Sequence, residues 1–232
     1  MASLSKQTAL FEQHTAHHAV FRSVADWQIP AHYGNAQEEA RRVRESVGLI
    51  DRSEIGTFEL TGRNLGAWFA GRFGIEVIPP LRSCTVTLDS NLTGRWLQLR
   101  QDHGFLLTAP EHATATLATL ASPSGDRPLL TDITSVYSAF QIAGPNAVAL
   151  LQKFTSLDLR PARFPEGACA QTAIAKVRAV ILHDTIAALP AYWIILTRDY
   201  AEFVWESLLH AGISLGLTPF GNDALEMLTK DK

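Results

Sequence analysis

Apolar positions recur along this chain with two different periods. Between 200 and 208, aromatic and aliphatic residues lie at helical spacing with two glutamates between them, which predicts an amphipathic helix. A second helix is predicted over 37–47, where two acids precede three arginines, the order that the helix dipole favours. Short alternating or continuously apolar runs predict strands at 96–99, 105–107, 177–182 and 192–196.

The order of these elements occurs twice. Residues 58–64 align with 140–146, and both stretches combine a strand, a glycine turn and the start of a helical pattern. Further on, 83–88 aligns with 168–173 and 105–111 with 193–199. We therefore predict an α+β fold of two pseudo-repeated β-α-β-β-β-α units around a central cleft, a place where ligand sites are common.

A turn-rich stretch separates the two predicted units. Residues 121–128 read Ala-Ser-Pro-Ser-Gly-Asp-Arg-Pro and have no apolar period. The predicted domains are 1–125, which holds an N-terminal arm and the first repeat, and 126–232, which holds the second.

The composition of the chain disfavours several classes of protein, among them nucleic-acid-binding and membrane-spanning proteins. The chain has 232 residues, 47% of them hydrophobic, and a net charge of -3 with 20 basic against 23 acidic residues, so we expect no nucleic-acid partner. No apolar run is long enough to span a membrane, and the N-terminus lacks a signal-peptide pattern. Two cysteines outside any CxxC pair favour a reducing cytoplasm.

Motifs of common enzyme classes are absent from the sequence. It has no dinucleotide or phosphate-binding glycine loop, no nucleophile elbow and no HExxH. His14, His17 and His18 have a spacing that could share one helical face, but no other ligand is in register, so we expect no metal site. Cys84 and Cys169 occupy equivalent strand positions and are expected to be small buried groups.

Two further groups stay open at this level. The aromatic turn around Trp27, Tyr33 and Gly34 could line a pocket or plug the core. The acids Asp51, Glu54 and Asp89 lie among predicted turns, where each is expected to be solvated or to cap a helix. We assign no catalytic residue from these patterns.

One ordered set of residues along the sequence matches a known family: His14, Val20, Phe21, Trp27, Pro30, Tyr33, Gly34, Glu38, Glu39, Val43, Arg44, 48–51, Ser53, Thr61, Gly62, 142–147, 203–208, Ala211 and Gly212. Through these residues the chain resembles the glycine-cleavage T protein, a tetrahydrofolate-dependent aminomethyltransferase. The resemblance implies a ferredoxin-like, folate-binding fold of two units around a cleft. Because the sequence ends at Lys232, we expect the C-terminal β-barrel of that family to be missing. The stretch 163–172 is most similar to the gamma subunit of heterotetrameric sarcosine oxidase.

Departures from the family pattern affect its chemistry. The family's Gly-Gly-x-x-Asp-Asp turn, whose aspartate contacts folate, corresponds to 93–98 here, where Leu97 and Gln98 replace both acids. The second family carboxylate falls within 186–193, where only Tyr192 matches, and the family arginine corresponds to Asn222. A leucine cannot exchange protons or accept a hydrogen bond, so the acid/base step is expected to be lost.

Several binding residues remain candidates. Gln98 could hydrogen-bond a pterin amide edge, Trp96 could stack on it, and Arg100 or Arg95 could pair with a glutamate tail. The predicted cofactor-binding set is Trp96, Leu97, Gln98, Arg100 and Tyr192, with tetrahydrofolate as the cofactor that the resemblance implies and that the lost acids would weaken or abolish.

These observations lead to an aminomethyltransferase-like, folate-binding protein of one-carbon metabolism with degraded catalytic residues. The alternative is a non-catalytic structural subunit of a sarcosine oxidase-type complex, with partner subunits in place of a substrate. The iron-sulfur-assembly branch of the superfamily is disfavoured, because Cys169 is followed by Ala170 and Gln171 instead of its Lys-Gly-Cys-Tyr-x-Gly-Gln motif.

Overall fold

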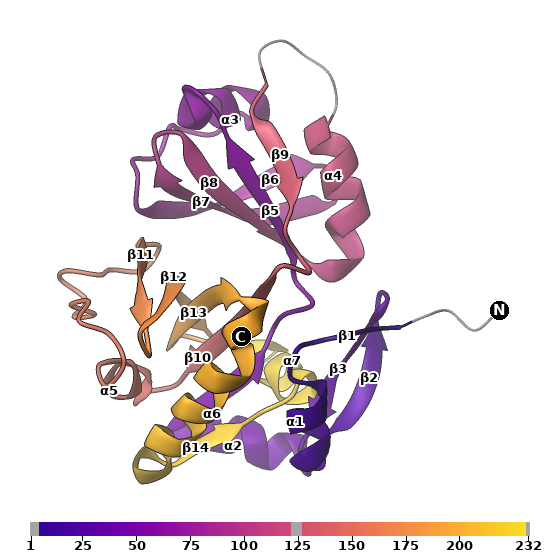
Figure 1. Ribbon diagram of the computed structural model, residues 1–232, viewed down its shortest axis with the longest axis vertical. Coiled ribbons are helices and arrows are strands. Elements are labelled where there is room, and N and C mark those ends of the chain that lie inside the picture. The colour runs from indigo at the N-terminus through magenta and orange to yellow at the C-terminus, as the bar shows by residue number, and fades with distance from the viewer. Residues whose placement is uncertain (1–4, 122–126, 231–232) are drawn as a thin grey trace.

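The computed structural model describes residues 5–121 and 127–230, which form three β-sheets and the helices packed on them. Figure 1 shows one α+β unit above a second one, with the N-terminal arm beside the lower unit. Within the described residues, no helix has the length and apolar character needed to cross a membrane.

The first unit is a five-stranded sheet in the order β6-β7-β8-β5-β9. Helices α3 and α4 pack on the sheet, and Phe58, Leu60 and Trp96 lie in the apolar core beneath them. The elements are β5 (Gly56–Thr61), α3 (Leu65–Phe73), β6 (Arg82–Asp89), β7 (Leu92–Arg100), β8 (His103–Thr108), η1 (Pro110–His112), α4 (Ala113–Ala121) and β9 (Leu129–Asp132).

The second unit is a six-stranded sheet in the order β11-β12-β13-β10-β4-β14. Phe140, Ile194 and Trp205 lie in its largest apolar core. The elements are β4 (Val47–Asp51), β10 (Tyr137–Ala143), α5 (Ala147–Leu151), β11 (Cys169–Ile174), β12 (Val177–Ile186), β13 (Leu189–Thr197), η2 (Arg198–Tyr200), α6 (Ala201–Gly212), η3 (Ile213–Leu215), β14 (Leu217–Pro219) and α7 (Asn222–Lys230).

The two sheets share one arrangement of strands. Strands β6-β7-β8-β5 of the first follow the same sequence of connections as β11-β12-β13-β10 of the second. Their fifth strands differ in origin, because β5 pairs with β9, which follows it, whereas β10 pairs with β4, which precedes the whole first unit.

Sheet membership therefore does not follow the predicted boundary after residue 125. The boundary itself lies outside the described residues, which omit 122–126. Strand β9 begins after the boundary yet belongs to the first sheet, and β4, which lies before the boundary, belongs to the second.

The N-terminal arm packs on the second unit. Its three-stranded sheet has the order β1-β3-β2, and α2 confirms the helix predicted over 37–47. On α2, the buried carboxylate of Glu39 accepts hydrogen bonds from the backbone N–H of Tyr33 (2.7 Å) and of Gly221 (2.9 Å). Gly221 is required there because a Cβ atom would lie 2.1 Å from the carbonyl oxygen of Ala31. The arm comprises β1 (Lys6–Gln7), α1 (Phe11–Ala16), β2 (Val20–Val24), β3 (Trp27–His32) and α2 (Ala36–Glu45).

The two sheets face each other across apolar side chains, which we call the inter-unit cluster. Backbone hydrogen bonds from Ser83 N–H to the Gly167 carbonyl (2.8 Å) and from Cys169 N–H to the Leu81 carbonyl (3.0 Å) also join the units. The cluster consists of Ile55, Leu97, Leu99, Phe105, Leu107, Ile133, Ala139, Cys169, Val180, Leu182, Trp193 and Ile195.

Candidate functional site

Leu97, which the resemblance aligns with a family acid, lies inside the inter-unit cluster. Its side chain is fully buried, and Leu99, Val180 and Trp193 belong to the same cluster. The neighbouring side chains of the cluster offer no carboxylate to a ligand at this point. The interface is therefore closed by apolar packing where the resemblance implies a reactive group.

Trp96 and Gln98 face the other side of β7. The Trp96 ring stacks on Phe69 of α3, with ring centroids 4.0 Å apart and planes 11° apart. The Gln98 side-chain oxygen accepts the Trp96 indole N–H (3.2 Å), and its amide donates to the Arg100 carbonyl (2.6 Å). Both side chains are thus occupied by contacts within the first unit.

Tyr192 and Arg100 lie in two further environments. Tyr192 is buried, stacks on His183 (centroids 4.5 Å apart) and has its pKa raised by burial. Arg100 is mostly exposed and approaches Asp102 at 3.3 Å. The five predicted cofactor-binding residues do not converge on one cavity, and their part in binding stays a prediction.

Charged groups border the inter-unit cluster. The Arg52 guanidinium lies 5.3 Å from the centroid of the Trp193 ring and donates to Glu54 (2.9 Å). Burial raises the pKa of Glu54, although Arg52 opposes the shift. On the other side, Asp184 accepts the Trp193 indole N–H (3.0 Å), with Arg95 3.9 Å away.

The expectation of solvated or capping acids fails at two of three positions. Asp51 and Glu54 are almost fully buried, while Asp89 is exposed and accepts the Ser90 N–H (2.7 Å). Asp51 escaped the prediction because its partner, His14, comes from a distant segment. Glu54 pairs with Arg52, two residues away, and its burial has no signal in the local sequence.

A buried chain of polar groups ties the arm to the second sheet. His14 Nε2 lies 3.0 Å from a carboxylate oxygen of Asp51, which can only accept, so Nε2–H is the donor. The other ring nitrogen is hydrogen-bonded to the Tyr33 hydroxyl (2.8 Å). Tyr33, which is half-buried, therefore belongs to this network, and Trp27 is buried in β3.

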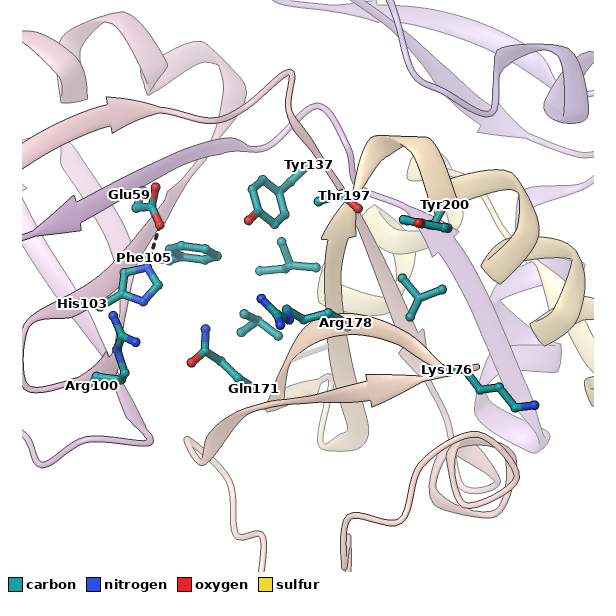
Figure 2. A pocket seen from close by; sticks show the side chains of 14 residues that line it. Glu59, Arg100, His103, Phe105, Tyr137, Gln171, Lys176, Arg178, Thr197 and Tyr200 are labelled. Atoms are coloured by element: carbon teal, nitrogen blue, oxygen red, sulfur yellow. Dashed lines mark hydrogen bonds and ion pairs between the residues drawn. The ribbon is translucent and has the colours of Figure 1, made fainter.

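A cavity of about 490 Å³ opens between the two units (Figure 2). Its first-unit wall includes Glu59, His103 and Phe105, and its second-unit wall includes Tyr137 and Arg178. Glu59 accepts a hydrogen bond from His103 Nε2 (2.7 Å), while the second ring nitrogen of His103 is buried without a partner among the described residues.

The polar residues of this cavity were missed by sequence reasoning. In β5, Phe58 and Leu60 point into the first-unit core, so the alternation of a strand places Glu59 on the opposite side, toward the second unit. Its aligned position is Gln141, which is also polar and is buried in β10. Polar residues at inward-facing positions of both repeats were the available signal.

The environments of Cys169 and His14 are typical of residues with a structural role. Cys169 is buried, and burial raises its pKa to about 12, so its thiol stays protonated near neutral pH. Both cysteines are free. The described part of the chain holds no group of three metal-ligating side chains, and His14 of the histidine cluster is bonded to Tyr33 and Asp51.

A family model for the GCVT N-terminal domain matches residues 10–232. The chain belongs to the GCVT N-terminal domain family. This places the two α+β units in the family of the glycine-cleavage T protein that the sequence resembles.

Relatives of this GCVT-domain protein fall into two groups. The aminomethyltransferase of Desulfitobacterium hafniense (strain DSM 10664 / DCB-2) is 27% identical over 237 residues, covering 96% of this chain and 63% of that protein. Sarcosine oxidase subunit alpha of Corynebacterium sp. (strain U-96) is 24% identical over 258 residues, covering 98% of this chain and 26% of that protein. The chain thus spans less than two thirds of the length of these relatives.

Solved structures show the same fold for this GCVT-domain chain. The glycine cleavage system aminomethyltransferase T from Bartonella henselae superposes with a TM-score of 0.84 at 18% identity, covering 97% of this chain and 62% of that one. A chain of heterotetrameric sarcosine oxidase from Corynebacterium sp. U-96 superposes with a TM-score of 0.62 at 16% identity.

Proposed function

We propose that this chain is an aminomethyltransferase-like protein of one-carbon metabolism that has lost the residues for the transfer step. One observation carries the proposal: Leu97 is fully buried in the inter-unit cluster at the position of a family acid. A hydrocarbon side chain in a closed apolar contact cannot exchange a proton with a substrate.

Tetrahydrofolate does not fit these residues in the way that the resemblance implies. Leu97 and Trp193 occupy the space between the sheets, and Trp96 and Gln98 are turned toward α3. Each pterin donor left without a carboxylate partner costs about 1–3 kcal/mol, or about tenfold to more than a hundredfold in affinity. Folate binding by this chain, which we keep as part of the proposal, is therefore expected to be weak.

An assay beside a relative tests this proposal. The chain and the Desulfitobacterium hafniense aminomethyltransferase would be compared in aminomethyl transfer to tetrahydrofolate and in calorimetry with 5-formyltetrahydrofolate. We expect no turnover by this chain and a dissociation constant at least about a hundredfold higher than that of the relative. Turnover or affinity within tenfold of the relative would overturn the proposal.

The second candidate is a non-catalytic subunit of a sarcosine oxidase-type complex. It is favoured by the match of sarcosine oxidase subunit alpha to 98% of this chain, and by large exposed apolar side chains such as Phe203 and Ile213 near the end of the second unit. Native size measurement of the tagged chain in extracts of its source cells tests it. A stoichiometric complex that includes other sarcosine oxidase-type subunits is expected, and a monomer would contradict it.

A further inference from the structure

We propose that the cavity between the two units binds a small aromatic oxyanion, a carboxylate or a phosphate, through the guanidinium of Arg178. The proposal concerns residues other than Leu97 and its family counterparts, so it does not depend on the proposed function. Three features of the cavity support it: its charge, its apolar floor and an unpaired ring nitrogen.

The cavity holds a positive charge without a counter-charge in contact with it. No carboxylate of the described residues forms an ion pair with Arg178, and Figure 2 shows its guanidinium between Gln171 and Tyr137. Lys176 belongs to the same lining but points away from the cavity centre in this view. A guanidinium with free N–H groups is suited to a planar carboxylate or to a phosphate, which it can bind through two parallel hydrogen bonds.

Negative charge lies on the first-unit wall of the cavity, on Glu59. Burial raises the pKa of Tyr137, with a further rise from Glu59 and an opposing effect from Arg178, so both charges act on the phenol. Glu59 is in turn paired with His103 and does not neutralise Arg178 directly. The oxyanion is thereby directed to the second-unit side of the cavity.

The floor of the cavity suits an aromatic ring. Phe105, Val180 and Ile195 are buried members of the inter-unit cluster that also line the cavity. Phe105 and Tyr137 meet edge to face with centroids 5.7 Å apart. The volume of about 490 Å³ falls in the usual range for small-molecule sites, and an apolar floor next to a guanidinium strengthens ion pairing.

The cavity wall also contains a buried ring nitrogen without a partner among the described residues, Nδ1 of His103. Because Nε2–H donates to Glu59, Nδ1 carries a lone pair that no described group satisfies. A buried acceptor without a partner is uncommon in proteins and indicates a missing donor.

Titration calorimetry with simple probes tests the proposal on the full chain. Benzoate and phenyl phosphate are the anionic probes, which also distinguish the two oxyanion chemistries, and benzamide is the neutral probe of matched shape. We expect saturable binding of at least one anion and none of benzamide. Equal binding of benzamide, or no binding of either anion, would overturn the proposal.

Substitution of Arg178 locates the site. Arg178→Gln should weaken the anionic probe by about tenfold or more, because it removes charge-assisted hydrogen bonds, and Arg178→Lys should weaken it less. Arg163→Gln removes an equally exposed arginine outside the cavity lining and should leave affinity unchanged. Unchanged affinity in Arg178→Gln would contradict the assignment. Since Arg178 is exposed, its variants should fold normally.

Discussion

Leu97 shows how one side chain determines what the cleft can do. The backbone of β7 places this position between the sheets, where the family resemblance implies an ionised acid. In this chain the position is surrounded by aliphatic and aromatic groups that exclude water. In a polar cleft, an acid at this position could take part in the reaction. In the apolar contact seen here, burying its charge without a partner would destabilise the fold.

Restoring the acid should therefore destabilise the protein without restoring activity. We expect Leu97→Asp to lower the free energy of unfolding by about 4 kcal/mol or more, because it buries a charge with no partner. Urea unfolding followed by circular dichroism measures the loss.

Leu97→Met is the control for that variant. It keeps the side-chain volume and should cost less than about 1.5 kcal/mol. A stable Leu97→Asp variant that transfers an aminomethyl group would show that the cluster opens to substrate, contrary to the packing described above.

At the scale of elements, the buried link between α1 and β4 makes stability depend on pH. Burial opposes ionisation of Asp51, but hydrogen bonds and charge from His14 and hydrogen bonds from Ser53 and Thr8 outweigh it and hold the pKa of Asp51 below its ordinary value. An acid with a lowered folded pKa stabilises the fold above about pH 4, and this contribution is lost as the pH falls further.

Asp51→Asn should remove that contribution. At pH 7 we expect a loss of about 3 kcal/mol, since one partner of a buried pair is removed, and the difference from the unmodified chain should shrink as the pH falls below about 4. Denaturant unfolding at a series of pH values measures both effects.

Asp158→Asn provides the matched control for this experiment. Asp158 also has a lowered pKa, about 2, caused by hydrogen bonds from Arg160, but it is exposed, so little change in stability is expected. A constant difference between Asp51→Asn and the unmodified chain at every pH would contradict a role for ionised Asp51.

Elements with a clear period could be predicted from the sequence, and contacts between elements could not. Helix α2 was predicted because its charges follow the helix dipole, and the strands of both repeats because their apolar positions alternate. The pairing of Glu59 with His103 joins β5 to β8, and that of His14 with Asp51 joins α1 to β4. Neither pair has a signal in local sequence.

For the whole molecule, the inter-unit cluster should make the two units unfold together. Apolar side chains from both sheets are buried in it, and backbone hydrogen bonds join residues 81–83 to 167–169. We expect one calorimetric transition with equal calorimetric and van't Hoff enthalpies. Two separate transitions would show that the units fold as independent domains.

The assignment of strands to sheets is a property of the whole molecule that the sequence repeat did not reveal. Alignment of 58–64 with 140–146 identifies equivalent strands, but it says nothing of β4, which has no counterpart in the aligned stretches. Its partner strand β10 is far along the chain. The pairing of the two strands is visible only in the structure, where Phe140 lies opposite Asp51.

Because β4 and β10 are neighbours, the chain leaves the larger sheet, builds the entire smaller one, and returns to the adjacent strand. Departure and return run close together, with the Arg52 N–H bonded to the Ala139 carbonyl at 2.7 Å. A single excision could thus remove the smaller sheet and leave every strand of the larger one connected in its present order. What remained would expose the apolar face of β12 and β13, so such a shortened relative would survive only with another protein surface covering it.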